Sequence, residues 1–166
     1  MGELEVRSIT NEEFGTFVAI LREAAAWLRD QGREMWTEEQ VAAKRLIREY
    51  AMREMFIGYT DGEEAAAAMI LQEADPLVWL EETERADSLY VHKLCVRRAF
   101  AATGCSSAML QWAKEQAVLR GKTWLRLDCA ADRPKLCTFY ERNGFVLVRE
   151  KSVHGNPTVL YECRAE

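Results

Sequence analysis

The stretch SLYVHKLCVRRAFAATGCSSAMLQWAKEQAVLR, residues 88–120, decides the fold. Its first part, residues 89–96, is rich in β-branched, aromatic and aliphatic side chains, which favours a strand. Its last part, residues 106–120, contains no Pro or Gly, and its apolar residues recur at helical spacing. Gly121 follows at the position where a left-handed residue commonly ends a helix. The stretch therefore predicts a strand, a turn and an amphipathic helix.

The turn between the two parts, residues 97–105, places Gly104 directly before the helix. The first N–H groups of a helix have no partner within it, and together with the helix dipole they favour an anion such as phosphate. Thr103, Ser106 and Ser107 add hydroxyl groups. The same pattern is also typical of an ordinary β–turn–α connection, so a phosphate site is one of two interpretations.

Size and composition favour one globular domain over residues 1–166. Apolar residues make up 49% of the chain and charged residues 30%, which are ordinary values for a domain with a core. No apolar run is long enough to span a membrane, and the N-terminus lacks the basic and apolar regions of a secretory signal. We therefore expect no membrane partner.

Cysteine usage and net charge exclude further classes. The five cysteines are scattered and form no C-x-x-C pair, and there are only two histidines. This pattern argues against a disulfide framework and against a metal site, and it favours a reducing, cytoplasmic location. The net charge of −5 argues against a nucleic-acid partner, which usually requires a basic face.

The N-terminal third predicts a strand and two helices. Residues 4–9 alternate as a strand does, and Thr10 with Glu13 forms a capping-box pattern for a helix ending near Asp30. A second capping-box pattern, residues 37–40, predicts a helix running to about Tyr50. The loop between the helices carries Met35 and Trp36, which either form one wall of a substrate site or cover the core.

The remaining segments predict a sheet. Residues 55–60 and 63–73 flank Asp61-Gly62, a strong hairpin signal, and an acid-rich loop follows at residues 75–87. After the central stretch we expect a strand at 123–129, a helix from about 132 to 143, and a hairpin of residues 145–151 with 158–163. The fold class is therefore α+β, with a mixed sheet.

Three segments resemble the Gcn5-related N-acetyltransferase family. The strand end Leu94-Cys95-Val96 is similar to the L-x-V segment of that family, and residues 101–106, AATGCS, to the glycine-containing turn of its motif A. Residues 139–145, FYERNGF, resemble its F-Y-x-x-x-G-F motif. The resemblance implies a largely antiparallel sheet of about six or seven strands, flanked by about four helices and splayed after the strand that ends at Val96.

The resemblance also implies acetyl-CoA as cosubstrate and no metal. Two motif positions differ from the family pattern, since Ala101 replaces an Arg or Gln and Ser106 replaces a Gly or Ala; in addition, Arg133 stands where an Asn is usual. These differences leave a second interpretation open, a non-catalytic CoA-binding sensor or interaction module. The residues implied in cofactor binding are Leu94, Cys95, Val96, Ala101, Ala102, Thr103, Gly104, Cys105, Ser106 and Arg133.

The implied reaction is direct transfer of an acetyl group to a primary amine. A backbone N–H near Leu94 would polarise the thioester carbonyl. Tyr140 is the implied general acid on the departing CoA thiolate, because the ordinary pKa values of a phenol and a thiol, about 10 and 8.5, are close. A core aromatic residue is the alternative role for Tyr140.

The base that deprotonates the amine has three candidates. Glu73 is the first, at the end of a predicted strand, followed by His92 and then Asp128, and each also has an ordinary structural role. The cysteines lack a His–Asp partner pattern and are interpreted as packing residues.

The resemblance implies a small-molecule or peptide amine as acceptor, with its walls expected around residues 29–36 and 75–87. A homodimer is compatible with the sequence.

Overall fold

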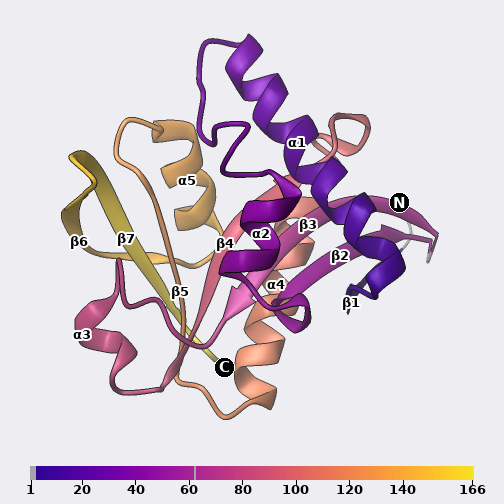
Figure 1. Cartoon of the computed structure of the whole chain (residues 1–166). Coiled ribbons are helices and arrows are strands. Elements are labelled where there is room, and N and C mark those ends of the chain that lie inside the picture. The colour runs from indigo at the N-terminus through magenta and orange to yellow at the C-terminus, as the bar shows by residue number, and fades with distance from the viewer. Residues whose placement is uncertain (1–2, 62) are drawn as a thin grey trace. The chain divides into compact units, whose positions relative to one another are not determined.

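The computed structural model describes residues 3–61 and 63–166. Seven strands form an open, mostly antiparallel sheet in the order β1-β2-β3-β4-β5-β7-β6 (Figure 1). This confirms the predicted fold class. The chain forms two compact units, residues 1–71 with 93–109 and residues 72–92 with 110–166.

The described residues contain five α-helices, one of them a single turn, where the sequence predicted about four helices. The elements in chain order are β1 (Leu4–Ser8), η1 (Asn11–Glu13), α1 (Phe14–Asp30), α2 (Ala43–Glu49), η2 (Met52–Glu54), β2 (Met55–Thr60), β3 (Glu64–Gln72), α3 (Leu80–Thr83), β4 (Ser88–Val96), η3 (Arg98–Phe100), α4 (Cys105–Leu119), β5 (Trp124–Ala130), α5 (Pro134–Arg142), β6 (Val146–Val153) and β7 (Asn156–Arg164).

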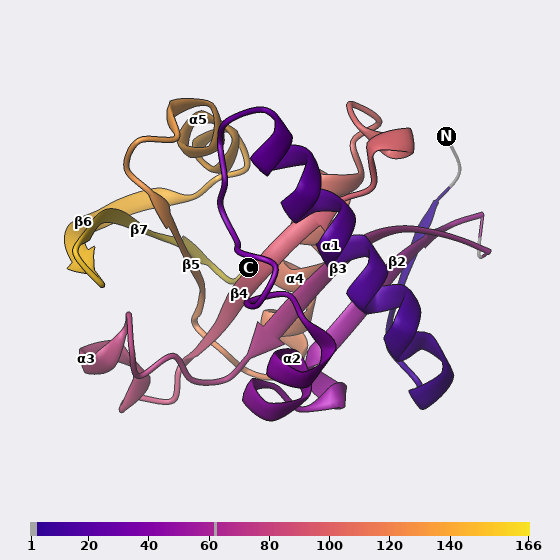
Figure 2. The same cartoon turned by 45° about the horizontal axis from the view of Figure 1, so that its top comes forward.

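The core of the first unit lies between α1 and the strands β2 and β3. Figure 2 shows α1 lying across β2 and β3. Phe17 and Leu21 of α1 are fully buried, and they belong to one apolar cluster with Ile57 of β2 and Ile70 of β3. Leu46 of α2 joins the same cluster. The buried apolar residues of α1 therefore form its core-facing side.

Gly58 of β2 allows the beginning of α4 to pack closely on the strand. A Cβ atom at this position would lie 2.7 Å from Sδ of Met109, which is too close for any side chain without a shift. The β2–β3 register is also irregular between Gly58 and Tyr59. The glycine thus positions the first turns of α4 within the first unit.

Two predicted boundaries are wrong. Thr37 and Gln40 exchange the expected capping-box hydrogen bonds, at 2.9 and 3.2 Å, but the helix starts only at Ala43. The capping-box hydrogen bonds of Thr37 and Gln40 therefore belong to a separate turn that precedes α2. The loop predicted at residues 75–87 contains the one-turn helix α3. The hairpin of β2 and β3 is confirmed, although Gly62 of its turn lies outside the described residues.

The second unit is built on β5, β7 and β6, with α5 packed over the β6–β7 hairpin (Figure 2). The first three residues of β4, Ser88–Tyr90, pair in parallel with the beginning of β5. The β6–β7 turn is made by His154 and Gly155, which both have a positive φ, as the tight turns of hairpins require.

A buried ion pair fixes α3 in the second unit. Glu82 of α3 accepts two hydrogen bonds from Arg149 of β6, at 2.7 and 2.9 Å, while its own side chain is only 8% exposed. The hydrogen bonds from Arg149 are the main reason that the pKa of Glu82 lies below its ordinary value. The pair holds the acid-rich segment against the hairpin.

The substitution Glu82→Gln should lower the free energy of unfolding at neutral pH by about 2 kcal/mol, because it removes a charged, bidentate partner from Arg149. A carboxyl with a lowered folded pKa stabilises the protein above its unfolded pKa, about 4.3, and this contribution is lost as the pH falls. Urea unfolding at pH 7 and pH 3.5 measures both effects. A difference between wild type and variant that is the same at both pH values would contradict the prediction.

Candidate active site

The turn before α4 has a left-handed backbone at two positions. Ala102 has φ +60° and Gly104 has φ +86°, and a Cβ atom at Gly104 would meet nothing within 4 Å. The glycine is therefore required by its backbone angle, and the space beside it is open. The Thr103 hydroxyl donates a hydrogen bond to the Phe100 carbonyl, which closes the turn.

The backbone N–H groups of this turn form a run of hydrogen-bond donors. Within residues 3–61 and 63–166, the N–H groups from Ala102 to Ser106 take part in no hydrogen bond, and the first helical bond of α4 runs from Ala108 to Gly104. Most of the turn is exposed to solvent, although Cys105 is buried. A run of free donors at the positive end of a fifteen-residue helix suits a phosphate group.

Helix α1 anchors the beginning of the turn. Glu23 accepts a hydrogen bond from the Arg98 N–H at 2.9 Å, and its other oxygen lies 3.6 Å from Nε of Arg97. The Arg98 guanidinium lies over the ring of Trp27, 3.7 Å from its centroid. Glu23 and Trp27 thus fix the turn from the same helix face, which the sequence pattern did not indicate.

The end of β4 carries a backbone irregularity. Lys93 has φ +52°, which is rare for a residue with a side chain and unusual within a strand. The parallel pairing of β4 with β5 covers only Ser88–Tyr90, and β4 continues for six further residues to Val96. The predicted cofactor residues Leu94, Cys95 and Val96 follow Lys93 directly and are half-buried.

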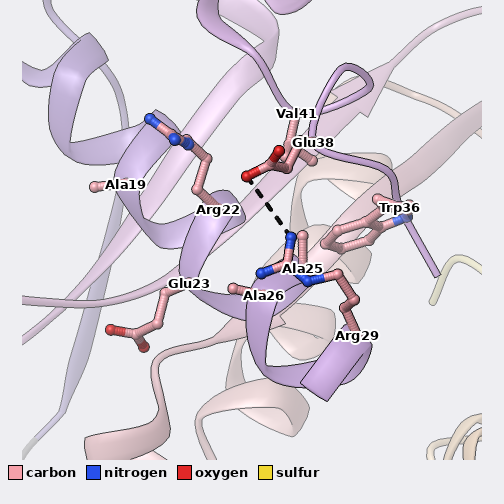
Figure 3. Close-up of a pocket in the computed structure, with 9 residues that line it drawn as sticks. All are labelled: Ala19, Arg22, Glu23, Ala25, Ala26, Arg29, Trp36, Glu38 and Val41. Carbon is pink, nitrogen blue, oxygen red and sulfur yellow. Dashed lines mark ion pairs between the residues drawn. The ribbon is translucent and has the colours of Figure 1, made fainter. Parts of the chain in front are cut away.

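A cavity of about 370 Å³ lies between α1 and the loop that precedes α2 (Figure 3). Small alanine side chains of α1 and Trp36 line it, and Arg29 reaches Glu38 at 3.6 Å on its rim. The Trp36 ring also lies 5.4 Å from Nζ of Lys93 on β4, and Glu23 lines the cavity as well. Two residues of the cavity lining, Trp36 and Glu23, therefore also contact β4 and the beginning of the turn.

Tyr140 of α5 lies in an aromatic cluster of the second unit. Its ring contacts Phe139, Phe145 and Tyr161, with centroids 5.4 to 6.3 Å apart. Its hydroxyl has no hydrogen-bond partner in the described part of the chain. Burial, with smaller contributions from Cys129 and Asp128, raises the pKa of Tyr140 well above its ordinary value. The phenol is therefore always protonated at physiological pH.

Two of the cysteines, Cys95 and Cys129, are thiols whose pKa is raised by burial. Sγ atoms of Cys129 and Cys137 lie 3.5 Å apart, and burial raises the pKa of Cys129 far above its ordinary value. Burial likewise raises the pKa of Cys95 to about 12. A nucleophilic cysteine usually has a lowered pKa, so the surroundings of Cys95 and Cys129 favour the packing role that the sequence suggested for them.

The three candidate bases have different surroundings in the second unit. Glu73 has a side chain that is 61% exposed, and it lies 3.7 Å from Nζ of Lys122. His92 faces the buried Asp75, with Nε2 3.7 Å from Oδ2. One polar atom each of Asp75, His92 and Asp128 lies within 4.8 Å of the others. The structure thus brings two candidates together and leaves Glu73 in a solvated ion pair.

Asp75 is the residue of this cluster that the sequence did not single out. It is one of several acids between residues 73 and 87, and no feature of the sequence distinguishes the buried one.

Arg133, predicted to bind the cofactor, lies at the beginning of α5 and its Nε lies 3.8 Å from Oδ1 of Asp132. None of the described helices is both long and apolar enough to cross a membrane.

A sequence model described as "Acetyltransferase (GNAT) family" matches residues 21–145, which include the turn, the strand end and Tyr140. The chain belongs to this family. Members of this family are acetyltransferases, so the chain is an acyltransferase. The sequence prediction of an enzyme is thereby confirmed.

Individual GNAT relatives agree with this assignment. The Bacillus subtilis protein YesJ, named an uncharacterized N-acetyltransferase, is 32% identical over 139 residues, covering 81% of this chain and 77% of YesJ. A GNAT acetyltransferase from Listeria monocytogenes has the same fold, with a TM-score of 0.80 at 23% identity over 97% of this chain and 94% of the other. The Salmonella typhimurium protein yncA, solved with its cofactor acetyl-CoA, has a TM-score of 0.71 at 11% identity, covering 99% and 95% of the two chains.

The substitution Gly104→Glu should weaken acetyl-CoA binding by about 30-fold or more, about 2 kcal/mol, because a carboxylate would face the phosphates. Gly104→Asn is the matched control, since Asn tolerates a positive φ and adds no charge, and it should change the dissociation constant less than about fivefold. Calorimetric titration with acetyl-CoA measures both. Equal binding by the Glu variant and wild type would place the phosphates elsewhere.

Proposed function

We propose that this GNAT enzyme transfers the acetyl group of acetyl-CoA to a primary amine by direct attack, with Tyr140 as general acid. The observation that carries the proposal is the state of Tyr140, a buried, fully protonated phenol whose hydroxyl has no partner among the described residues. Such a hydroxyl is available to an incoming group.

The first unit contains the groups that would hold acetyl-CoA. The free N–H groups from Ala102 to Ser106 fit the pyrophosphate, and the open space at Gly104 allows it to approach the backbone. The strand residues Leu94 to Val96 would pair with the pantetheine arm, as an added strand pairs with a sheet edge. Ala101 and Ser106 do not interfere with this role, because the donors are backbone groups.

Tyr140 would supply the proton that the leaving sulfur needs. Since its pKa is raised, the phenol does not lose its proton before the reaction, and it gives up the proton only as negative charge collects on the sulfur. Burial also raises the pKa of Cys95 and Cys129, which argues against either thiol as an acyl-accepting nucleophile. Direct transfer is therefore the simplest reaction that these groups support.

The cavity beside α1 is the proposed acceptor site. Its lining comes from residues 19 to 41, which include part of the wall expected from the sequence, and two lining residues, Trp36 and Glu23, lie near Lys93 and Arg97. Its alanine lining leaves space, while Arg22, Glu23, Arg29 and Glu38 surround it with charges of both signs. A small amine or a peptide end of modest size fits such a cavity.

The substitution Tyr140→Phe should lower kcat by about 100-fold, because the departing thiolate loses its proton donor. Acetyl-CoA binding and thermal stability should change little, since the hydroxyl makes no hydrogen bond with the described residues. Release of free CoA thiol is measured with spermidine, glycinamide, tyramine and an unacetylated peptide as acceptors.

Tyr161→Phe is the matched control for this experiment. It removes a hydroxyl from a neighbouring ring, one that donates a hydrogen bond to Glu141 at 2.9 Å. This control should lose some stability and keep its kcat. Acetylation by Tyr140→Phe at the wild-type rate would exclude the acid role, and no acetylation of any amine by wild type would argue against the proposed reaction.

The substitution Ala26→Leu should raise KM for the amine by about tenfold, because the larger side chain fills part of the cavity. Ala24→Leu adds the same group to the same helix outside the cavity lining and should leave KM unchanged. Steady-state kinetics at saturating acetyl-CoA measure both. An unchanged KM in Ala26→Leu, with stable folding, would place the acceptor outside this cavity.

A further inference from the structure

We infer that the acceptor amine carries an anionic group, a carboxylate or a phosphonate, and that the guanidinium groups of Arg22 and Arg29 bind this group in the cavity beside α1. The inference rests on the proposed function, because it takes that cavity as the acceptor site. It narrows the acceptor from any primary amine to a small amine with an acid group, and it identifies the two residues that select it.

Helix α1 presents both arginines on the side that lines the cavity (Figure 3). Arg22 and Arg29 are separated by almost two helical turns, so their side chains leave the same face of the helix, about 10 Å apart along its axis. Ala25 and Ala26 lie between them in sequence and also line the cavity. The helix therefore has a long cationic side chain on each side of a floor that its small residues leave open.

Arg22 has no carboxylate partner. Its guanidinium takes part in no ion pair or hydrogen bond with the part of the chain that the structure describes. Its neighbours on the helix surface, three and four positions away, carry no charge: Val18, Ala19, Ala25 and Ala26. A guanidinium has N–H donors in a planar arrangement that matches a carboxylate or a phosphonate. Arg22 is therefore a cation on the cavity wall that remains available to a ligand.

Arg29 is held only loosely by carboxylates. Its Nη1 lies 3.6 Å from Oε1 of Glu38, and its Nε lies 3.7 Å from Oδ1 of Asp30. Both distances are too long for a hydrogen bond, and the two acidic side chains are 76% and 70% exposed. Exposed ion pairs of this kind contribute little to stability. An anion that enters the cavity can therefore replace Glu38 at Arg29 with little loss of stability.

The negative charges of the cavity wall already face cations of the protein. Glu23 accepts a hydrogen bond from the Arg98 N–H at 2.9 Å and lies 3.6 Å from Nε of Arg97. Glu38, the other carboxylate of the lining, faces Arg29. The remaining charge of the lining is positive, and it belongs to Arg22. Such a wall favours an acceptor with a negative group over a polyamine or a basic peptide.

The apolar lining and the cavity volume limit the rest of the ligand. Ala25 and Val41 are buried, and Trp36 adds an aromatic ring to the wall. The volume of about 370 Å³ is near the lower end of the range for ligand pockets. A short apolar chain that joins an acid group to a primary amine matches both features.

The first test measures selectivity with matched pairs of amines. Glycine, β-alanine and γ-aminobutyrate are each compared with the corresponding amide, which keeps the amine and removes the negative charge. Aminopropylphosphonate is added to distinguish a phosphonate from a carboxylate. For the best acid, kcat/KM of wild type, calculated for the unprotonated amine, should be about 30-fold higher than for its amide, because the amide loses a charge-assisted pair with a guanidinium.

Variants of Arg22 test its part in this selectivity. Arg22→Gln should lower the acid-to-amide ratio of kcat/KM by about tenfold, and Arg22→Lys, which keeps the charge, should retain part of the ratio. Arg33→Gln is the matched control, since it removes the same charge from the loop after α1, outside the cavity lining, and should leave the ratio unchanged. A purely structural defect would lower kcat/KM for acid and amide alike and would not move the ratio.

The second test detects the anion without catalysis. The acetylated forms of the three acids keep the acid group and have no reactive amine. At least one of them should shift the NMR signals of the Nε–H groups of Arg22 and Arg29 in a saturable titration of the isotope-labelled protein, and the acetylated amides should not. The dissociation constant for that acid should rise about tenfold in Arg22→Gln and stay unchanged in Arg33→Gln.

Three kinetic results would overturn the inference and leave the transfer reaction intact. The first is acetylation of acids and amides with equal kcat/KM by wild type, and the second is an unchanged ratio in Arg22→Gln. The third is a preference for spermidine over every acid that Glu38→Gln abolishes, which would make the cavity a cation site. If wild type acetylates no amine, the proposed function fails, and the NMR titration then decides the anion site: shifted signals support it, and unshifted signals exclude it.

Discussion

The backbone N–H groups between Ala102 and Ser106 impose the main constraint on the first unit. They lie at the beginning of a long helix, in a turn that is left-handed at two positions, and the described chain offers them no acceptor. A buried helix end would not tolerate this, so the turn has to stay open to solvent or to a ligand. The packing of Met109 at Gly58 and the bonds of Glu23 to Arg97 and Arg98 keep it in that place.

The same helix that anchors the turn also lines the cavity. Glu23 contacts both, and Trp36 connects the cavity to β4 through Lys93. Because these contacts all belong to the first unit, a ligand that displaces Arg97 from Glu23 would change the charge at the cavity rim. Under the proposed function, the cofactor at the turn and the acceptor in the cavity would both bind beside the same carboxylate, Glu23.

Most of the fold could be predicted because its signals are local. The strand at residues 89–96, the helix stop at Gly121 and the hairpin of β6 and β7 each follow from periodicity or from turn residues close in sequence. The start of α2 could not be predicted, since a capping box such as Thr37–Gln40 is satisfied equally well by an isolated turn. The same holds for α3, whose single turn depends on Arg149 far along the chain.

The candidate site was only partly predictable, for a related reason. The turn residues and Tyr140 lie in motifs that can be read from neighbouring positions, and they carry the resemblance to the GNAT family. Asp75 and Glu23 owe their importance to burial and to partners distant in sequence, such as His92 and Arg98. Several acids between residues 73 and 87 have similar neighbours, so only the three-dimensional structure separates Asp75 from the others.

Lys93 of β4 lies where the chain passes from the second unit back to the first. Lys93 has a positive φ, and it is the first residue of the segment 93–109, which belongs to the first unit. A non-glycine residue in this conformation is less stable than a straight strand by about 1 kcal/mol. The strand β4 therefore contains its least favourable backbone conformation at the place where the chain passes from one unit to the other.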